Sequence, residues 1–316
     1  MKQRNRPFFS IIIPTYQRAR LLERCLRAIT RLDYPTDRFE VVVVDDGSRV
    51  CPEKIVAPFA ACLDMTLLRG VHNGPAAARN VGAARAKGEF LVFTDDDCAP
   101  LPDWLQSFSK RFTDTPGCLI GGRTINGLPG NPYSSASQLL CDYLYAYYNA
   151  DHNNAQFLTS NNLALERKRF TMLGGFDTDF CRAGGEDREF SSRWLRHGYR
   201  ILYAPEAAVL HTHSLTFNTF FRQHLTYGRG AFLFHRKQND PCECLTRLEH
   251  LSFYSGLLGY PYLLPLKRKR PLFASLFMVS QVAVAAGYFL ERINRGPERG
   301  KFGLEQRPER DVDKHG

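Results

Sequence analysis

The strongest constraint on the fold is a pattern in the first 120 residues, where short apolar runs alternate with segments of helical spacing. The runs Phe8–Ile13, Phe39–Val44 and Glu89–Thr94 have no regular polar alternation, and the segments Leu21–Thr30 and Pro75–Lys87 between them have helical spacing. Apolar runs of this kind are typical of strands that are buried on both faces. The alternation therefore predicts an α/β fold, with a mostly parallel sheet and helices on both of its faces.

Acidic residues are concentrated where two of these runs end. Asp95, Asp96 and Asp97 directly follow the run that ends at Thr94, and Asp45 and Asp46 follow the run that ends at Val44. In α/β folds the carboxyl ends of the strands form the ligand site. Adjacent carboxylates repel one another, burial raises the cost of their charge, and a divalent cation is the usual remedy. The triplet therefore predicts a metal site that can also hold a diphosphate.

Two more polar groups occupy equivalent places. The segment Pro14-Thr15-Tyr16-Gln17-Arg18 follows the first run, and Arg79 and Asn80 lie in a helix that opens at Asn73-Gly74-Pro75. The amides at a helix N-terminus favour phosphate. An Asp-Gly pair such as Asp46-Gly47 is, by itself, more often a simple turn. Four polar groups at successive strand ends favour one shared ligand site.

Charge and cysteine content narrow the class of protein. The net charge is +10, and half of this excess lies in residues 267–316, which hold 11 Lys and Arg against 6 Asp and Glu. Such a tail suits anionic lipid or a phosphorylated substrate, and without a nucleic-acid-binding motif we expect no nucleic acid partner. The nine cysteines form no disulfide framework, which indicates reduced thiols. Cys242-Glu243-Cys244 matches no familiar zinc spacing, and we interpret it as structural or incidental.

The C-terminal part is apolar in a different way. Pro271–Leu290 contains no charged side chain over a length that can span a hydrocarbon core. Leu251–Leu266 is also uncharged but is interrupted by Pro261 and Pro265, and a basic tetrad, Lys267–Arg270, separates the two segments. The alternative is a pair of buried helices in a soluble domain. We favour membrane contact, with the first segment re-entrant or in the membrane plane and the tetrad at anionic headgroups.

Four motifs together resemble glycosyltransferase family 2. They are Ser10-Ile11-Ile12-Ile13-Pro14-Thr15-Tyr16, Val43-Val44-Asp45-Asp46-Gly47-Ser48, Ala78-Arg79-Asn80-Val81-Gly82 and Phe93-Thr94-Asp95-Asp96-Asp97. The resemblance covers residues 8–215. It implies a GT-A (Rossmann-like) fold, a nucleotide-sugar donor, most readily a UDP-sugar, a Mn²⁺ or Mg²⁺ cofactor, and sugar transfer with inversion.

The resemblance also implies roles for the acids. Asp97 is expected to be a direct metal ligand, Asp95 to contact the ribose or the metal, and Asp96 to belong to the same donor site; which two of the three act on the metal stays open. Thr15 and Asp46 are expected to hold the nucleoside, with Asp45 beside them. Pro14, Arg79 and Asn80 complete the nucleotide-sugar-binding set. His211, at a strand end, is a candidate third metal ligand, although a histidine there is often only structural.

A carboxylate base is expected in Gly184-Gly185-Glu186-Asp187, which resembles the family's Glu-Asp motif. Asp187 is the candidate catalytic base and Glu186 its supporting neighbour, because an inverting transfer needs a base to take the proton of the acceptor hydroxyl. The alternative is helix capping, since acids are favoured in a first turn. The Gln-x-x-Arg-Trp motif of the family's processive members is absent. This absence favours the addition of a single sugar.

Three functions are compatible with parts of this pattern. The first is a glycosyltransferase at the cytoplasmic face of the cell membrane, acting on a glycan or polyprenyl-linked acceptor of the cell envelope. The second is a sugar-nucleotide pyrophosphorylase, which needs a glycine-rich basic loop that residues 14–18 do not provide. The third is a non-catalytic, membrane-tethered binding protein, although its signature would be the loss of acids that are present here. We expect the first, with a catalytic domain over residues 1–215, a connecting helix over 216–250 and membrane-associated helices with a charged tail over 251–316.

Overall fold

The computed structural model describes residues 6–238 and 249–296, so that Cys242-Glu243-Cys244 lies outside the described residues. The chain forms an eight-stranded sheet with strand order β3-β2-β1-β4-β7-β6-β8-β5. The strands are β1 Phe9–Thr15, β2 Phe39–Asp45, β3 Met65–Arg69, β4 Phe90–Thr94, β5 Cys98–Pro100, β6 Leu119–Asn126, β7 Asn162–Glu166 and β8 Ile201–His211.

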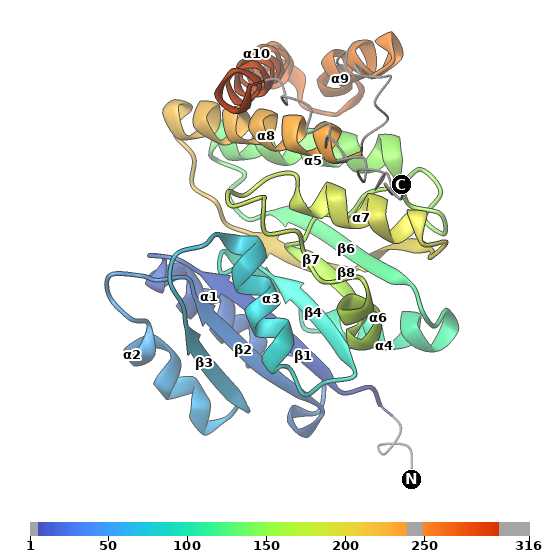
Figure 1. Ribbon diagram of the computed structural model, residues 1–316. Coiled ribbons are helices and arrows are strands. Elements are labelled where there is room, and N and C mark those ends of the chain that lie inside the picture. The colour runs from blue at the N-terminus through green and yellow to red at the C-terminus, as the bar shows by residue number, and fades with distance from the viewer. Residues whose placement is uncertain (1–5, 239–248, 297–316) are drawn as a thin grey trace, which may run out of the picture.

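Helices cover the sheet and form a further layer beyond one of its ends (Figure 1). They are α1 Ala19–Ile29, α2 Glu53–Val56, α3 Pro75–Arg85, α4 Trp104–Asp114, α5 Pro132–Tyr148, α6 Arg167–Met172, α7 Glu186–Arg196, α8 Phe217–Lys237, α9 Leu251–Leu263 and α10 Arg270–Arg295. Short 3-10 turns, η2 Thr36–Arg38, η3 Ala57–Ala61 and η4 Lys267–Lys269, connect some of them.

The half of the sheet that carries the acidic motifs is parallel, as the sequence predicts. β1 pairs in parallel with β2 and β4, and β2 pairs in parallel with β3. The other half is mixed: β7 runs antiparallel to β4 and β6, β8 is parallel to β6, and β5 is antiparallel to β8. The predicted α/β class is confirmed. The sheet also contains the antiparallel strands β5 and β7, which the apolar runs do not reveal.

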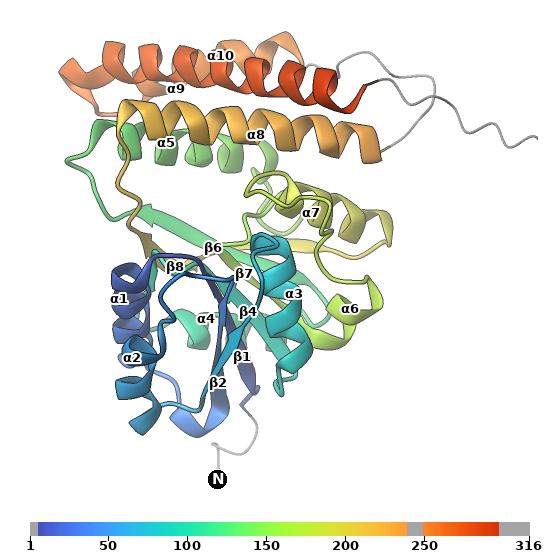
Figure 2. The same cartoon turned by 60° about the vertical axis from the view of Figure 1, so that its left-hand side comes forward.

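Two apolar cores hold the helices against the sheet, one on each face. Alternate residues of β1 divide between them: Ile11 packs with α1 and α4, and Ile12 packs with α3, α6 and α7. Figure 2 shows α1, α2 and α4 on one side of the strands and α3 and α6 on the other. Because both faces are covered, the strands need no polar alternation.

β8 is one long strand, Ile201–His211, with Pro205 in its interior. Its pairing with β6 shifts register between Gly122 and Arg123. This bulge accommodates Pro205. Proline has no amide hydrogen, so it interrupts the regular hydrogen bonding between paired strands. The long strand brings His211 opposite Cys98 of β5.

The C-terminal helices form a third layer with α5 and α8, seen at the top of Figure 2. α8 and α10 approach so closely that a Cβ added at Gly228 would lie 1.9 Å from the Val284 carbonyl oxygen, and one at Gly287 1.9 Å from that of Leu225. Among the described helices, α10 is long and apolar enough to cross a membrane by length and composition, and a third of its most apolar window is buried. Its length confirms the predicted C-terminal apolar helix.

Candidate active site

The site forms at the carboxyl ends of β1, β2 and β4. Thr15, the last residue of β1, lies opposite Asp45, the last residue of β2, and Asp95 follows the end of β4 directly. Three of the motifs expected to share a ligand thus meet at one edge of the sheet. The fourth is brought there by α3, which packs on β1 and β2.

Asp45 and Asp46 shape the loops at this edge. The Ser48 amide donates a hydrogen bond to Asp45 Oδ1 (3.1 Å), which fixes the turn after β2. Asp46 accepts hydrogen bonds from the backbone amides of Asn73 (2.9 Å) and Gly74 (3.0 Å), and its Oδ2 lies 2.8 Å from His72 Nδ1. The Asp46 carboxylate therefore holds the loop that opens α3.

Each aspartate of the triplet has a different partner. Asp96 accepts hydrogen bonds from Thr15 Oγ1 (2.7 Å) and from Arg18 (3.2 Å). Asp97 pairs with Arg18 (3.0 Å) through Oδ2 and with His211 Nε2 (3.3 Å) through Oδ1. Asp95 is the most exposed of the three and pairs with Arg79 (2.7 Å).

The electrostatics of the triplet follow from these contacts. Burial raises the pKa of Asp96 to about 7, against the lowering effect of Arg18. Burial also opposes the charge of Asp97, but His211 and Arg18 outweigh it and hold the pKa of Asp97 below its usual range. The same pairing with Asp97 raises the pKa of His211 against the effect of burial. Asp97 and His211 therefore form an ion pair, and Arg18 supplies a second positive charge to the triplet.

Arg79 connects the triplet with the predicted base motif. Its buried guanidinium donates to Asp95 Oδ1 (2.7 Å) and to Glu186 Oε1 (3.2 Å), across 107 residues of sequence in the second case. Glu186 also accepts a hydrogen bond from the Gly184 amide (2.7 Å), which fixes the loop before α7. Asp187 is half-buried beside Glu186, and its pKa is raised to about 7 by burial and by the negative charge of Glu186.

Two of the expected binding residues are engaged in the scaffold. Both polar atoms of the Asn80 side chain bond to the backbone of Phe176, at 2.7 and 2.8 Å. Pro14 is buried within β1, opposite Val44. Direct contact of Asn80 or Pro14 with a donor stays a prediction.

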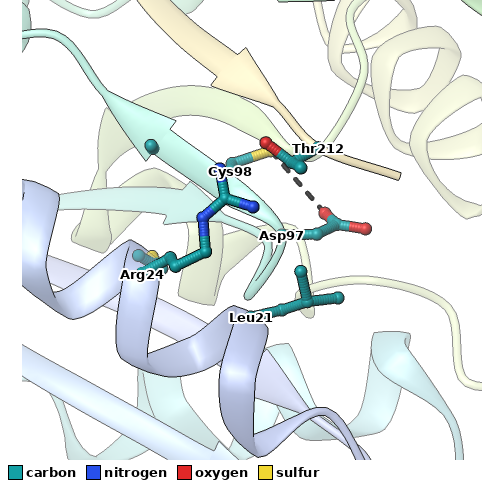
Figure 3. A pocket seen from close by; sticks show the side chains of 7 residues that line it. Leu21, Arg24, Asp97, Cys98 and Thr212 are labelled. Atoms are coloured by element: carbon teal, nitrogen blue, oxygen red, sulfur yellow. Dashed lines mark hydrogen bonds between the residues drawn. The ribbon is translucent and has the colours of Figure 1, made fainter. Parts of the chain in front are cut away.

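Arg18 and Cys98 were missed as site residues by reasoning from the sequence. Arg18 was noted only as part of a polar segment, although an arginine directly after a strand end is a natural counter-charge for acids at the neighbouring strand end. Cys98 follows the aspartate triplet directly and lies with Asp97 and His211. Figure 3 shows Asp97 and Cys98 beside Leu21 and Arg24 of α1 and Thr212, which follows β8.

The donor set suits a hard divalent cation. Asp95 and Asp97 offer carboxylate oxygens and His211 offers an imidazole nitrogen, all of which Mn²⁺ accepts, and oxygen ligands also suit Mg²⁺. A cation would also relieve the repulsion among three consecutive carboxylates, two of which are buried.

Comparison with known proteins agrees with this geometry. The model of "Glycosyl transferase family 2" matches residues 10–173, and that of "Glycosyl transferase family group 2" matches residues 137–290. The chain is 26% identical over 226 residues to the glycosyltransferase AglE of Haloferax volcanii, covering 71% of this chain and 73% of AglE. It is 29% identical to the pre-mycofactocin glycosyltransferase of Mycobacterium tuberculosis over 70% of this chain and 46% of that protein.

Solved structures share the fold. The mannosyltransferase PcManGT of Pyrobaculum calidifontis, in complex with GDP-Man and Mn²⁺, superposes with a TM-score of 0.65 at 21% identity, covering 92% of this chain and 89% of that one. Staphylococcus aureus TarS 1–349 with UDP-GlcNAc gives a TM-score of 0.51 at 17% identity, covering 91% of each chain.

Fold, site and relatives together define a glycosyltransferase that uses a nucleotide-sugar donor. The chain belongs to glycosyl transferase family 2. Among the three functions with which the sequence is compatible, family membership identifies the transferase.

Proposed function

We propose that this protein is a metal-dependent, inverting transferase that moves one sugar from a nucleotide-sugar donor to an acceptor hydroxyl of a lipid-linked or cell-envelope glycan. The observation that carries the proposal is the double ion pair of Arg79. It joins Asp95, in the triplet, to Glu186, next to Asp187. One buried side chain thereby fixes the spacing between the donor end and the base end of the site.

At the donor end, Asp95, Asp97 and His211 are the residues that would hold Mn²⁺ or Mg²⁺, with Asp96 supporting them through Thr15 and Arg18. When bound, the cation neutralises charge on the departing diphosphate. Arg18 has an exposed stem and a guanidinium already at the triplet, so it is placed to move between the carboxylates and an incoming diphosphate.

The nucleoside would lie toward Thr15, Asp45 and Asp46. The rings of Tyr16 and His72 stack 4.1 Å apart beside these residues, and both side chains are exposed enough to meet a planar base. The solved relatives carry GDP-Man or UDP-GlcNAc, and we propose a UDP-sugar for this chain.

At the base end, Asp187 would take the proton of the acceptor hydroxyl. A carboxylate with a pKa near 7 is a suitable general base, because about half of it is ionised at neutral pH and it still holds the proton it receives. Glu186 raises the pKa of Asp187 and is itself held by Arg79.

We also propose that the protein works at the cytoplasmic face of the cell membrane, which it contacts through residues 251–316. The support is the apolar α10 with basic residues at both ends. A membrane location brings the enzyme to a polyprenyl-linked acceptor. The three-part division of the chain at residues 215 and 250 belongs to the same proposal.

A donor screen on the wild type, followed by the substitution Asp187→Asn, tests the catalytic part of the proposal. The screen measures nucleotide release with Mn²⁺ and a panel of nucleotide sugars, and it identifies the donor. We expect Asp187→Asn to lower kcat by about 10²- to 10⁴-fold, the usual contribution of a general base, with nucleotide binding by calorimetry unchanged. Asp114→Asn, an exposed acid of α4, is the control and should transfer normally. Transfer by Asp187→Asn at the wild-type rate would show that another group is the base.

A further inference from the structure

Asp97, Cys98 and His211 bring together three donor atoms of different chemistry. Asp97 Oδ1 lies 3.3 Å from His211 Nε2 and 3.9 Å from Cys98 Sγ, and the three donor atoms all lie within 4.8 Å of one another. Their positions follow from the fold, because Cys98 of β5 and His211 of β8 are paired across the sheet.

From this geometry we propose that Asp97, Cys98 and His211 form a site for a borderline-soft divalent cation, Zn²⁺ or Co²⁺. This ligand set differs from the one proposed above for Mn²⁺ or Mg²⁺ in that it includes a sulfur and omits Asp95. Imidazole and thiolate ligands suit Zn²⁺ and Co²⁺ better than they suit Mg²⁺.

One of the separations has the value that a tetrahedral ion requires. Zinc bonds of about 2.3 Å to sulfur and about 2.0 Å to nitrogen or oxygen place neighbouring donor atoms roughly 3.3–3.5 Å apart. The separation between Asp97 and His211 already has this value. Cys98 Sγ lies 3.9 Å from Asp97 Oδ1 and within 4.8 Å of His211 Nε2, so it would have to move closer to both atoms.

The surroundings leave these donor atoms available to an ion. Arg18 pairs with the other oxygen of Asp97, Oδ2, so that Oδ1 contacts only His211 and the thiol among the contacts described. Besides Asp97 Oδ1, the Cys98 thiol meets the Asn161 side-chain amide, at 3.8 Å. Coordination of a cation by the sulfur would release the thiol proton to solvent.

A consequence for the enzyme is competition between metals. Asp97 and His211 belong to both ligand sets, so an ion held by Cys98 would occupy residues that Mn²⁺ or Mg²⁺ needs. Zinc binding at the sulfur-containing set should therefore inhibit transfer. Binding itself does not require that the protein transfers sugar.

Co²⁺ titration tests the site without an activity assay. The experiment uses full-length, reduced protein carrying Cys242→Ser and Cys244→Ser, since those two cysteines lie outside the described residues and could bind Co²⁺ themselves. We expect a sulfur-to-cobalt charge-transfer band in the near ultraviolet that saturates at one ion per chain. Adding Cys98→Ser should abolish the band. Adding Cys25→Ser should leave it intact, because Cys25 lines a small cavity together with Asp97 and Cys98 but lies outside the three-donor set.

A band that persists in Cys98→Ser, or its absence from the parent protein, would overturn the proposal. Circular dichroism checks that each variant is folded. If Cys98→Ser does not fold, X-ray absorption by the zinc-loaded parent decides: a sulfur neighbour supports the site, and a shell of oxygen and nitrogen alone refutes it.

Discussion

The two adjacent acids at the start of α7 differ in their surroundings, and this difference sets their separate parts in the proposed mechanism. Arg79 compensates the charge of Glu186 at 3.2 Å, whereas Asp187 has no ion pair among the described contacts. Burial, followed by the negative charge of Glu186, raises the pKa of Asp187 to about 7. Arg79 therefore holds Glu186 in place, and Asp187 is the acid that we expect to exchange a proton near neutral pH.

This difference predicts the pH dependence of transfer. A base must be deprotonated to act, so we expect kcat/KM to rise with pH through about 7 and to level off above it. Glu186→Gln removes one cause of the raised pKa and should move the rising limb to lower pH. Glu189→Gln, on the same helix but paired with Arg193, is the control and should leave the limb in place. If the rise of kcat/KM occurred at the same pH in Glu186→Gln as in the wild type, the pH dependence would not arise from Asp187.

At the scale of elements, the contact between α8 and α10 depends on two glycines. At Gly287 a Cβ would lie 1.9 Å from the Leu225 carbonyl oxygen, a backbone atom that cannot turn away as a side chain can. The two helices must therefore separate to admit even one methyl group. Since α8 also contacts the Gly184–Gly185 loop through Gly230, the α8–α10 pair supports the segment that carries Asp187.

A pair of glycine-to-alanine substitutions tests this packing. Alanine is favoured over glycine in a helix by about 1 kcal/mol, and Gly259→Ala in α9, where nothing lies within 4 Å of the new Cβ, should gain up to that amount in the free energy of unfolding. Gly287→Ala should instead lose about 1–3 kcal/mol, because overpacking outweighs propensity. Denaturant unfolding of the two variants measures the contrast. Equal gains in both would show that α8 and α10 are not closely packed.

At the scale of the whole molecule, local patterns predicted one half of the fold better than the other. The parallel strands β1, β2 and β4 are apolar runs, and the motifs at their ends mark the site. The pairing of β5 with β8 and the Arg79–Glu186 contact join residues about a hundred positions apart, and no periodicity encodes such a contact. For the same reason the sequence indicated Asp187 and the triplet separately but not the arginine that connects them.

The outer surface of α10 is the part of the molecule best suited to meet a membrane. Met278, Val282, Phe289 and Ile293 are exposed and recur at spacings of four, seven and four residues, which places them on one face. Exposed Arg268 and Lys269 precede this apolar face, and exposed Arg292 and Arg295 lie in the last turn of α10. Because the opposite side of α10 is bound to α8, we expect α10 to lie in the membrane plane rather than cross it.

Charged substitutions on this face test the membrane proposal in the full-length protein. Burying a large apolar side chain contributes about 1.5–3 kcal/mol, so Val282→Glu with Phe289→Glu should weaken partitioning by roughly 100-fold or more. Sedimentation with phosphatidylcholine vesicles, with and without phosphatidylglycerol, measures it, and the wild type should bind the anionic vesicles more strongly. Met172→Glu, an exposed apolar residue of α6, is the control and should bind as the wild type does. If the wild type stayed in solution but self-associated, and the double variant were monomeric, the apolar face would instead be covered by a second copy of the chain.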